Sequence, residues 1–409
     1  MNAASSPIVY LDYASTTPVA AEVVAAMRDC LSPAGAFANP ASAHAAGRRS
    51  AGRVEEARAR VASLIHARPR ELIFTSGATE SVNLAVQGAA RYRATRGRHL
   101  VTLRSEHKAA VACFEALERE GFEVSWLPCG ADGVLDLALL EGALRDDTQL
   151  VSVMHVNNEI GVIQDIAAIG ALCRSRDILF HCDAAQSAGK LPLDVEEMAI
   201  DLLSLTAHKM YGPQGAGALY VADRPGCHVE PLLYGGAQER RLRPGTLAVH
   251  QIVGFGAAAE LATAGREQDL AHVRSLYDRL WAGIGDLPGV IRNGAAGSGY
   301  CGILNVSAPG VDGESLMLDL EPLCVAAGSA CNAQSGEPSQ VLHALGAGPA
   351  RAQSAIRFSF GRGTSAAEID LAIERYRHAV TRLTAMAPPG GSDESPESGP
   401  RGAGPRRRA

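Results

Sequence analysis

Five polar side chains follow two short apolar runs near the middle of the chain, at 178–180 and 201–205. They are Asp183, Gln186, Thr206, His208 and Lys209. Each run has the length and apolar character of a buried strand. In open α/β sheets, binding sites form at the carboxyl ends of the strands. The sequence therefore predicts that an acid, a hydroxyl, an imidazole and an amine meet in one site of the kind that holds a cofactor.

Any one of these residues would also suit a core strand followed by a solvated turn. For a lone aspartate or a lone lysine, that plainer interpretation is the better one. Here the run Thr-Ala-His-Lys at 206–209 is followed by Gly-Pro-Gln-Gly at 212–215. A hydroxyl, an imidazole and an amine next to a glycine-rich turn favour a binding site.

A further candidate is a strand-to-helix turn earlier in the chain. The strand expected at 71–75 runs into Ser-Gly-Ala-Thr-Glu at 76–80, and a helix follows. Free backbone N–H groups at a helix N-terminus bind anions, and the hydroxyl of Thr79 adds another donor. Such turns cap many helices, so this motif alone is a weak indication of an anion site.

Composition indicates the class of protein. The chain has 409 residues, of which 47% are hydrophobic and 20% charged, as in soluble globular proteins of two or three domains. The net charge of −6 gives no reason to expect nucleic acid or an anionic membrane as the partner. No apolar run approaches the roughly 18–20 residues that span a bilayer, and residues 1–7 lack a signal-peptide pattern. We therefore expect a cytoplasmic protein.

The nine cysteines are scattered and include no C-x-x-C pair. This pattern argues against a disulfide framework and against a structural zinc site. Most of the cysteines are expected to be buried apolar fillers. Cys331 differs, because it ends the stretch Gly-Ser-Ala-Cys at 328–331, which is not the sequence of a core strand.

Hydrophobic patterning divides the chain into two predicted domains and a tail. Residues 18–260 alternate strands with helices, which is typical of a parallel, doubly wound α/β sheet. Its strands are expected at 71–75, 100–103, 123–127, 149–154, 178–182, 202–205 and 217–221. Residues 1–17 and 261–386 are expected to form a smaller α+β domain. Its strands are expected at 303–307, 324–327 and 356–360. Residues 387–409, a Pro/Gly tail with an Arg run, are expected to be disordered and solvated.

The motifs taken together resemble one known family. They are Tyr10-Leu-Asp-Tyr13, Thr16-Thr-Pro18, Asn39-Pro-Ala-Ser42, Phe74-Thr-Ser-Gly-Ala-Thr-Glu-Ser81, Glu106-His-Lys108, Met154-His-Val-Asn-Asn-Glu-Ile-Gly161, Asp183-Ala-Ala-Gln186, Ala207-His-Lys-Met-Tyr-Gly-Pro213, Gly328-Ser-Ala-Cys331, Glu337-Pro-Ser339 and Ile356-Arg-Phe-Ser359. In this order the chain is similar to the cysteine desulfurases, which are relatives of the class V aminotransferases. The resemblance implies the fold of type I PLP-dependent transferases. That fold is α/β, with a mostly parallel seven-stranded sheet in a large domain and a smaller α+β domain.

The resemblance also implies which residues hold pyridoxal 5′-phosphate. Lys209 corresponds to the lysine that forms a Schiff base with this cofactor and then moves the Cα proton of the substrate. Asp183 corresponds to the carboxylate that keeps the pyridine nitrogen protonated. His107 resembles the residue stacked on the ring and counted among the catalytic ones, with a core histidine as the alternative. Further implied contacts are Ala78, Thr79, Asn158, Gln186, Thr206 and His208, and Thr246 contributed to the partner subunit. Such a site is complete only in a homodimer.

The same resemblance implies the reaction and its partners. Arg357 matches the arginine that binds the substrate carboxylate, with Asn158 beside it, and the loop at 14–17 lines the same pocket. The thiolate of Cys331 attacks the sulfur of L-cysteine, which gives L-alanine and a persulfide on Cys331. An acceptor such as an iron–sulfur scaffold protein then takes the sulfur for cluster or thio-cofactor assembly. No resident metal is expected in the cofactor site, beyond a transient bond between Cys331 and a cluster iron.

Two alternatives share most of these residues. Selenocysteine lyase has the same cofactor site and differs in the chalcogen that it removes. Another class V PLP aminotransferase or lyase would not need Cys331. Three residues depart from those usual in the family, since Thr206 replaces a frequent serine, Gln214 a basic residue and Gln238 a histidine. These departures concern the loops of the site and not the reaction.

Overall fold

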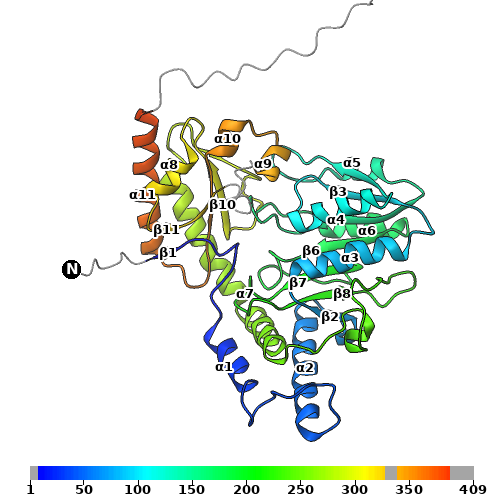
Figure 1. The fold of residues 1–409 in the computed structure, drawn as a ribbon. Coiled ribbons are helices and arrows are strands. Elements are labelled where there is room, and N and C mark those ends of the chain that lie inside the picture. The colour runs from blue at the N-terminus through cyan, green and yellow to red at the C-terminus, as the bar shows by residue number, and fades with distance from the viewer. Residues whose placement is uncertain (1–7, 328–338, 387–409) are drawn as a thin grey trace, which may run out of the picture.

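The computed structural model of the chain describes residues 8–327 and 339–386. Cys331 and the predicted tail at 387–409 lie outside these ranges. Figure 1 shows two adjoining parts linked by a long helix, with the large sheet on one side and helix α11 at the far edge of the other. The α-helices of the described residues are α1 (Ala21–Asp29), α2 (Ala45–Leu64), α3 (Ala78–Tyr92), α4 (Lys108–Arg119), α5 (Leu137–Ala143), α6 (Ile166–Ser175), α7 (Val249–Ile284), α8 (Gly313–Asp319), α9 (Gln340–Ala344), α10 (Pro349–Gln353) and α11 (Ala366–Met386).

The large part is built around a seven-stranded sheet with the strand order β2-β8-β7-β6-β5-β3-β4. The strands are β2 (Leu72–Thr75), β3 (His99–Leu103), β4 (Glu123–Leu127), β5 (Thr148–Met154), β6 (Leu179–Asp183), β7 (Leu202–Thr206) and β8 (Gly217–Val221). Strand β8 runs antiparallel to both of its neighbours, and the other pairs are parallel. The predicted mostly parallel sheet is therefore confirmed.

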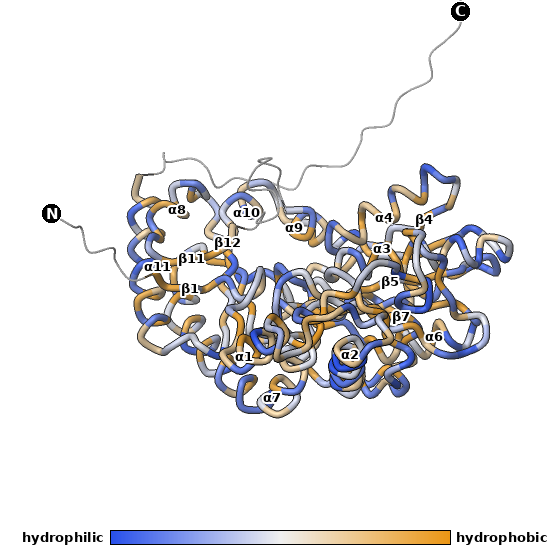
Figure 2. The backbone as a smooth tube through the Cα atoms, turned by 60° about the horizontal axis from the view of Figure 1, so that its bottom comes forward, coloured by the Kyte–Doolittle hydropathy of each residue, from blue (hydrophilic) through white to orange (hydrophobic). Residues whose placement is uncertain are grey.

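The burial of these strands explains their apolar sequences. Every residue of β5, β6 and β7 is buried, as expected for strands covered on both faces. Figure 2 shows hydrophobic residues along β5 and β7, whereas α2 is mostly hydrophilic. Strand β4 lies at the edge of the sheet and is only partly buried. The sheet interior thus forms the main hydrophobic core.

One buried row across the sheet is polar. His181 on β6 lies between Ser152 on β5 and Ser204 on β7, and its ring nitrogens are 2.8 Å and 2.9 Å from the two hydroxyls. Burial lowers the pKa of His181 to about 4, so the ring is neutral. Asp183 projects from the same face of β6, two residues further on. The polar row therefore lies directly beneath the carboxylate that ends the strand.

The smaller part has a four-stranded antiparallel sheet with the order β12-β13-β10-β9. Its strands are β9 (Ile291–Arg292), β10 (Ile303–Ser307), β12 (Ala326–Ala327) and β13 (Ala355–Ser359). A separate parallel pair joins β1 (Val9–Tyr10) to β11 (Leu323–Cys324). Helices α8 and α11 pack on a second core that includes residues of β1, β10 and β13. The N-terminal segment thus packs with this smaller part.

Helix α7 belongs to both cores. Its N-terminal half, including Ile252 and Phe255, is buried in the core of the large sheet. Its C-terminal half, including Val273 and Leu280, is buried in the core of the smaller part. The domain boundary predicted at residue 260 lies inside this continuous helix, and the division at 18–260 and 261–386 remains a prediction.

Local predictions differ from the structure in a few places. The strand predicted at 324–327 is two short strands, because β11 pairs with β1 and β12 pairs with β13. The helix predicted from 47 to 66 ends at Leu64, since His66 has a φ of 57°. The loop predicted at 234–246 contains a tight turn at Gln238–Arg241, in which Glu239, Arg240 and Arg241 have positive φ values of 44°, 57° and 67°.

Candidate active site

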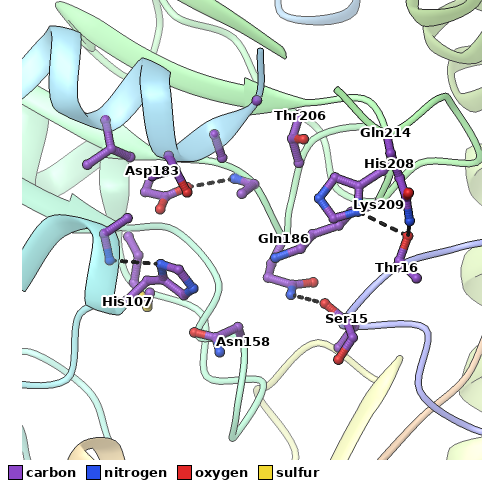
Figure 3. Close-up of a pocket in the computed structure, with 18 of the residues that line it drawn as sticks. Ser15, Thr16, His107, Asn158, Asp183, Gln186, Thr206, His208, Lys209 and Gln214 are labelled. Atoms are coloured by element: carbon purple, nitrogen blue, oxygen red, sulfur yellow. Dashed lines mark hydrogen bonds between the residues drawn. The ribbon is translucent and has the colours of Figure 1, made fainter. Parts of the chain in front are cut away.

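A cavity of about 490 Å³ lies where the carboxyl ends of β5, β6 and β7 meet the N-termini of α3 and α4. The sequence predicts a site at this place, because binding sites in open α/β sheets lie at the carboxyl ends of the strands. The predicted residues that line it are Ala78, Thr79, His107, Asn158, Asp183, Gln186, Thr206, His208, Lys209 and Arg357. Figure 3 shows several of these side chains converging on the cavity from different elements.

Two predicted site residues do not line this cavity. Thr246 is exposed in the loop before α7 and is absent from the lining. Cys331 lies outside the described residues, but both flanks of its segment are described. On one side, Ala326 of β12 pairs with Arg357 of β13. On the other side, the hydroxyl of Ser339 donates to the carboxylate of Glu159 at 2.5 Å. Both flanks therefore adjoin segments that contribute to the cavity.

Asp183 is fixed at the end of β6 by its own backbone. Its Oδ1 accepts a hydrogen bond from the backbone N–H of Ala185 at 2.9 Å, and the residue is 6% exposed. The bond leaves other lone pairs of the carboxylate available to a ligand. A buried carboxylate in this position favours a protonated nitrogen in whatever ring binds opposite it.

His107 is held by the helix that it caps. Its Nδ1 accepts from the backbone N–H of Ala109 at 3.1 Å at the start of α4, so the ring proton resides on Nε2. Burial, together with the charges of Lys209 and Lys108, lowers the pKa of His107, against an opposing effect of Asp183. The ring is therefore a neutral, oriented face on one side of the cavity.

The N-terminus of α3 forms an anion-binding end of the cavity. Gly77 precedes the helix with a φ of 154°, a conformation that side chains rarely adopt. The helix is 15 residues long, and Ala78 and Thr79 in its first turn present backbone N–H groups. The hydroxyl of Thr206 is close to this helix end, because a Cβ atom added to Gly77 would lie 3.9 Å from it. This end of the cavity suits a phosphate.

His208 and Gln186 are tied to the N-terminal segment. His208 Nδ1 is 3.1 Å from the hydroxyl of Thr16, and Gln186 Nε2 donates to the carbonyl of Ala14 at 2.7 Å. Burial and the nearby lysines lower the pKa of His208 to about 4. The ammonium of Lys190 donates to Gln186 Oε1 at 3.1 Å, which fixes the orientation of the amide. The loop at 14–17 therefore closes one side of the cavity, as predicted from the sequence.

Lys209 lies in the cavity in a cationic environment. Burial and the charges of Lys209 and Arg357 lower the pKa of Lys190 to about 7. The ammonium groups of Lys190 and Lys209 are therefore close enough for their charges to interact. A neutral amine is the form that attacks an aldehyde.

Arg357 forms the opposite wall, from β13 of the smaller part. Its Nη1 donates to the carbonyl of Asn158 at 2.7 Å, and its Nη2 donates to Asp12 Oδ1 and to Ser15 Oγ, each at 2.7 Å. Two buried polar atoms of this wall have no hydrogen-bond partner among the described residues, namely Arg357 Nε and Asn158 Oδ1. Such atoms in a cavity indicate a polar ligand.

Comparison with known proteins assigns the family. A model of the family described as aminotransferase class-V matches residues 9–371. A protein named cysteine desulfurase IscS from Shewanella woodyi is 54% identical over 381 residues, which are 93% of this chain and 94% of that protein. A protein of the same name from Vibrio cholerae is 52% identical over equal shares. The chain belongs to the cysteine desulfurases of the class-V aminotransferase family.

Solved structures agree with this family. A NifS-like protein has a TM-score of 0.85 and 33% identity over 92% of this chain and all of that one. A structure titled SspA in complex with cysteine has a TM-score of 0.76 and 37% identity over 86% of this chain and 98% of that one. These likenesses confirm the predicted fold class of a type I PLP enzyme.

The sequence did not predict every residue that supports this cysteine desulfurase site. Glu106 belongs to the motif Glu-His-Lys at 106–108, which predicts no role for it. It is buried, and its Oε1 accepts from the backbone N–H of Met154 at 2.8 Å. Burial raises its pKa well above the ordinary value. The sequence likewise predicts no role for Asp12 or Lys190. A signal existed for Asp12, which stands in the motif Tyr-Leu-Asp-Tyr, but nothing in the sequence pairs it with Arg357.

In the part of the chain that the structure describes, no helix is both long and apolar enough to cross a membrane. Nor do the His, Cys, Asp and Glu side chains of that part form a cluster of three or more that could hold a metal ion.

Proposed function

We propose that this chain is a PLP-dependent cysteine desulfurase that converts L-cysteine to L-alanine and retains the sulfur as a persulfide on Cys331. The observation that carries the proposal is the convergence of Lys209, Asp183 and Arg357 in one cavity of a desulfurase fold. An amine, a buried carboxylate and a guanidinium are what an amino-acid substrate and a pyridine cofactor together require.

The cavity fits pyridoxal 5′-phosphate. The first turn of α3 and the hydroxyl of Thr206 would hold its phosphate, and Lys209 would hold its aldehyde end. Asp183 would keep its ring nitrogen protonated, and the neutral ring of His107 would lie against its face. The unpartnered Oδ1 of Asn158 supports a polar ligand here. When bound, the cofactor supplies an electron sink that stabilises negative charge at the substrate Cα.

The residues of the chain supply binding and proton transfer. Arg357 binds the α-carboxylate of L-cysteine, which orients the Cα–H bond inside the cavity. Lys209 removes the Cα proton and later returns a proton to carbon. The strand ends and the loop at 14–17 surround this pocket, which limits the access of water during the transfer.

Cys331 performs the sulfur step as a thiolate. Its sulfur forms an S–S bond with the substrate sulfur while the Cβ–S bond of the substrate breaks. The bonding electron pair goes to the carbon side and is protonated, which yields L-alanine. The persulfide keeps the transferred sulfur. The position of both flanks of residues 328–338 beside the cavity wall supports this role for Cys331.

The test is an assay of purified holoenzyme with L-cysteine and a reductant, in which alanine and sulfide are both measured. We expect equal amounts of the two products. Cys331→Ser should abolish both, whereas the matched variant Cys324→Ser, in β11, should retain them. Full sulfide release by Cys331→Ser would contradict the proposal. A parallel assay with L-selenocysteine distinguishes selenocysteine lyase, which would act on that substrate and not on L-cysteine.

We further propose that the chain is a homodimer in which Thr246 completes the phosphate site of the partner subunit. The exposure of Leu233 (56%) and Tyr234 (85%) near this loop supports a covering subunit. Light scattering of the holoenzyme tests the dimer, and Thr246→Ala should then weaken cofactor retention. The proposed sulfur acceptor is an iron–sulfur scaffold protein, which is tested by transfer of ³⁵S from labelled enzyme.

A further inference from the structure

A carboxylate of the N-terminal segment is bonded to the guanidinium that faces the substrate. Asp12 Oδ1 accepts from Arg357 Nη2 at 2.7 Å, although the two residues are 345 positions apart. Ser15 Oγ accepts from the same nitrogen at 2.7 Å and donates to Asp12 Oδ1 at 2.9 Å. Three side chains therefore form a closed triangle of hydrogen bonds.

The two members of this triangle from the N-terminal segment occupy different positions. Ser15 lines the cavity, together with Arg357, whereas Asp12 is not part of the lining. Asp12 thus contacts the guanidinium from outside the space that a ligand fills. A competitor for the substrate carboxylate would have to lie inside that space.

The backbone around Asp12 is fixed to the strand that carries Arg357. Asp12 forms a parallel bridge with Ser359, and the N–H of Ser359 donates to the carbonyl of Leu11 at 2.8 Å. The hydroxyl of Ser359 also accepts from the backbone N–H of Ala14 at 2.9 Å. The carboxylate is therefore held at a constant position relative to β13.

Three of the five N–H donors of Arg357 are used within the protein, and Nε has no partner among the described residues. Both protons of Nη2 bond to Asp12 and Ser15, and Nη1 bonds to the carbonyl of Asn158. The side chain is only 5% exposed, so an unpaired charge there would be costly. Bonds from two different parts of the molecule fix the plane of the guanidinium before any ligand arrives. A guanidinium that is already oriented loses less conformational entropy when it binds a carboxylate.

We infer that Asp12, through its bond to Arg357 and Ser15, is a positioning residue that presents the guanidinium to the carboxylate of the substrate. This inference rests on the proposed function, in which Arg357 binds that carboxylate. Asp12 itself touches neither substrate nor cofactor. Its effect should therefore depend on whether the ligand has a carboxylate.

The experiment compares two ligands of the holoenzyme by isothermal titration calorimetry. L-Alanine is the proposed product, and ethylamine is the same molecule without its carboxylate. We expect Asp12→Ala to weaken L-alanine binding about tenfold and to leave ethylamine binding unchanged. Asp12→Asn, which keeps an acceptor oxygen and loses the charge, should weaken L-alanine binding by about threefold.

Asp269→Ala is the matched control. Asp269 pairs with Arg362 at 2.6 Å, and its side chain is 27% exposed, against 23% for Asp12. This pair lies outside the cavity lining, so L-alanine binding should be unchanged. Thermal melting reports whether each variant is folded. If Asp12→Ala is not folded, the comparison uses Asp12→Asn.

Each remaining outcome overturns a specific statement. L-Alanine binding that is unchanged or tighter in both Asp12 variants refutes positioning, since Asp12 would then be inert or a competitor. Equal weakening of L-alanine and ethylamine indicates a general structural role and also refutes it. A wild type that binds L-alanine no more tightly than ethylamine refutes the role of Arg357 on which the inference rests. A wild type that converts no L-cysteine to alanine refutes the proposed function, and the ligand comparison still reports on Asp12.

Discussion

The two walls of the cavity are assembled in different ways. Asp183, Thr206 and His107 form one wall, which we call the cofactor wall after its proposed ligand. Each of them stands at the end of a strand of the large sheet or at the start of a helix that packs on it. Arg357 and Asn158 form the other wall, which we call the substrate wall after its proposed ligand, and Asp12 contacts it from outside the lining. Hydrogen bonds join Arg357 to residues 345 and 199 positions away in the chain. The cofactor wall follows from the topology of one sheet. The substrate wall exists only once the N-terminal segment and the smaller part have assembled on the large one.

The largest expected effect is that of Lys209→Ala, which removes the amine from the cofactor wall. Loss of the proton carrier alone lowers rates by about 10²–10⁴-fold, and loss of the group that holds the aldehyde end adds to this. Alanine formation should fall by at least about 10³-fold. Lys108→Ala changes an exposed lysine beside His107 and should retain activity. Activity above a tenth of wild type in Lys209→Ala would break the assignment of the cofactor wall.

Asp183→Asn should lower kcat on the order of 100-fold, because a neutral amide no longer favours a protonated ring nitrogen. Cofactor content should stay close to wild type, since the phosphate end is untouched. The matched control is Asp136→Asn. Asp136 accepts from Ala138 N at 2.9 Å, just as Asp183 accepts from Ala185 N, but it lies away from the cavity. Steady-state kinetics with L-cysteine measure both variants, and equal kcat values would contradict the proposed role.

On the substrate wall, Arg357→Lys should raise KM for L-cysteine by roughly ten- to a hundredfold with a smaller change in kcat. A lysine keeps the charge but loses the planar fork, and charge-assisted hydrogen bonds contribute about 1.5–3 kcal/mol. Arg362→Lys, which alters the nearby pair with Asp269, should leave KM unchanged. A drop in kcat at constant KM would instead indicate that the two walls are not separate in function.

The smallest expected effect concerns the polar row beneath the cofactor wall. The pKa of folded His181 is about 4, below the ordinary value of 6.5 in the unfolded chain. Between these pH values the unfolded chain binds a proton that the folded chain does not, so stability is complete above about pH 6.5 and falls as the pH decreases. At pH 5 the loss from this one group is about 2 kcal/mol.

His181→Gln should therefore show a smaller decrease in unfolding free energy from pH 7 to pH 5 than wild type does. Urea denaturation at both pH values measures it. His378→Gln, at an exposed position, should behave as wild type. If the unfolding free energy decreases equally in His181→Gln and wild type, then His181 does not contribute to the pH dependence of stability.

The sequence predicted the cofactor wall more completely than the substrate wall, for a physical reason. Apolar runs such as 178–180 and 201–205 are long enough to identify buried strands, and the polar residues that follow them must meet at one sheet edge. The strands predicted from such apolar runs are present in the large sheet. Arg357 and the loop at 14–17 were predicted only through the resemblance to a family.

What the sequence did not predict depends on contacts between distant segments. Nothing local to Asp12 indicates that it pairs with Arg357, since the pairing is set by a bridge to Ser359. Nothing local to Lys190 indicates that it fixes the amide of Gln186. The division of the run at 324–327 into two strands also depends on two different partner strands. These features arise from tertiary assembly and have no periodic signature.

The length of helix α7 fixes how the smaller part is rotated relative to the large one, and so how the two walls face each other. Its 36 residues extend over about 54 Å without interruption and are anchored in one core at Phe255 and in the other at Leu280. Inserting one residue between these anchors would turn everything beyond it by about 100° around the helix axis. Leu280 would then leave its core, and the smaller part could dock only by turning Arg357 away from the strand ends. The two cores that helix α7 joins therefore fix the number of residues between its anchors.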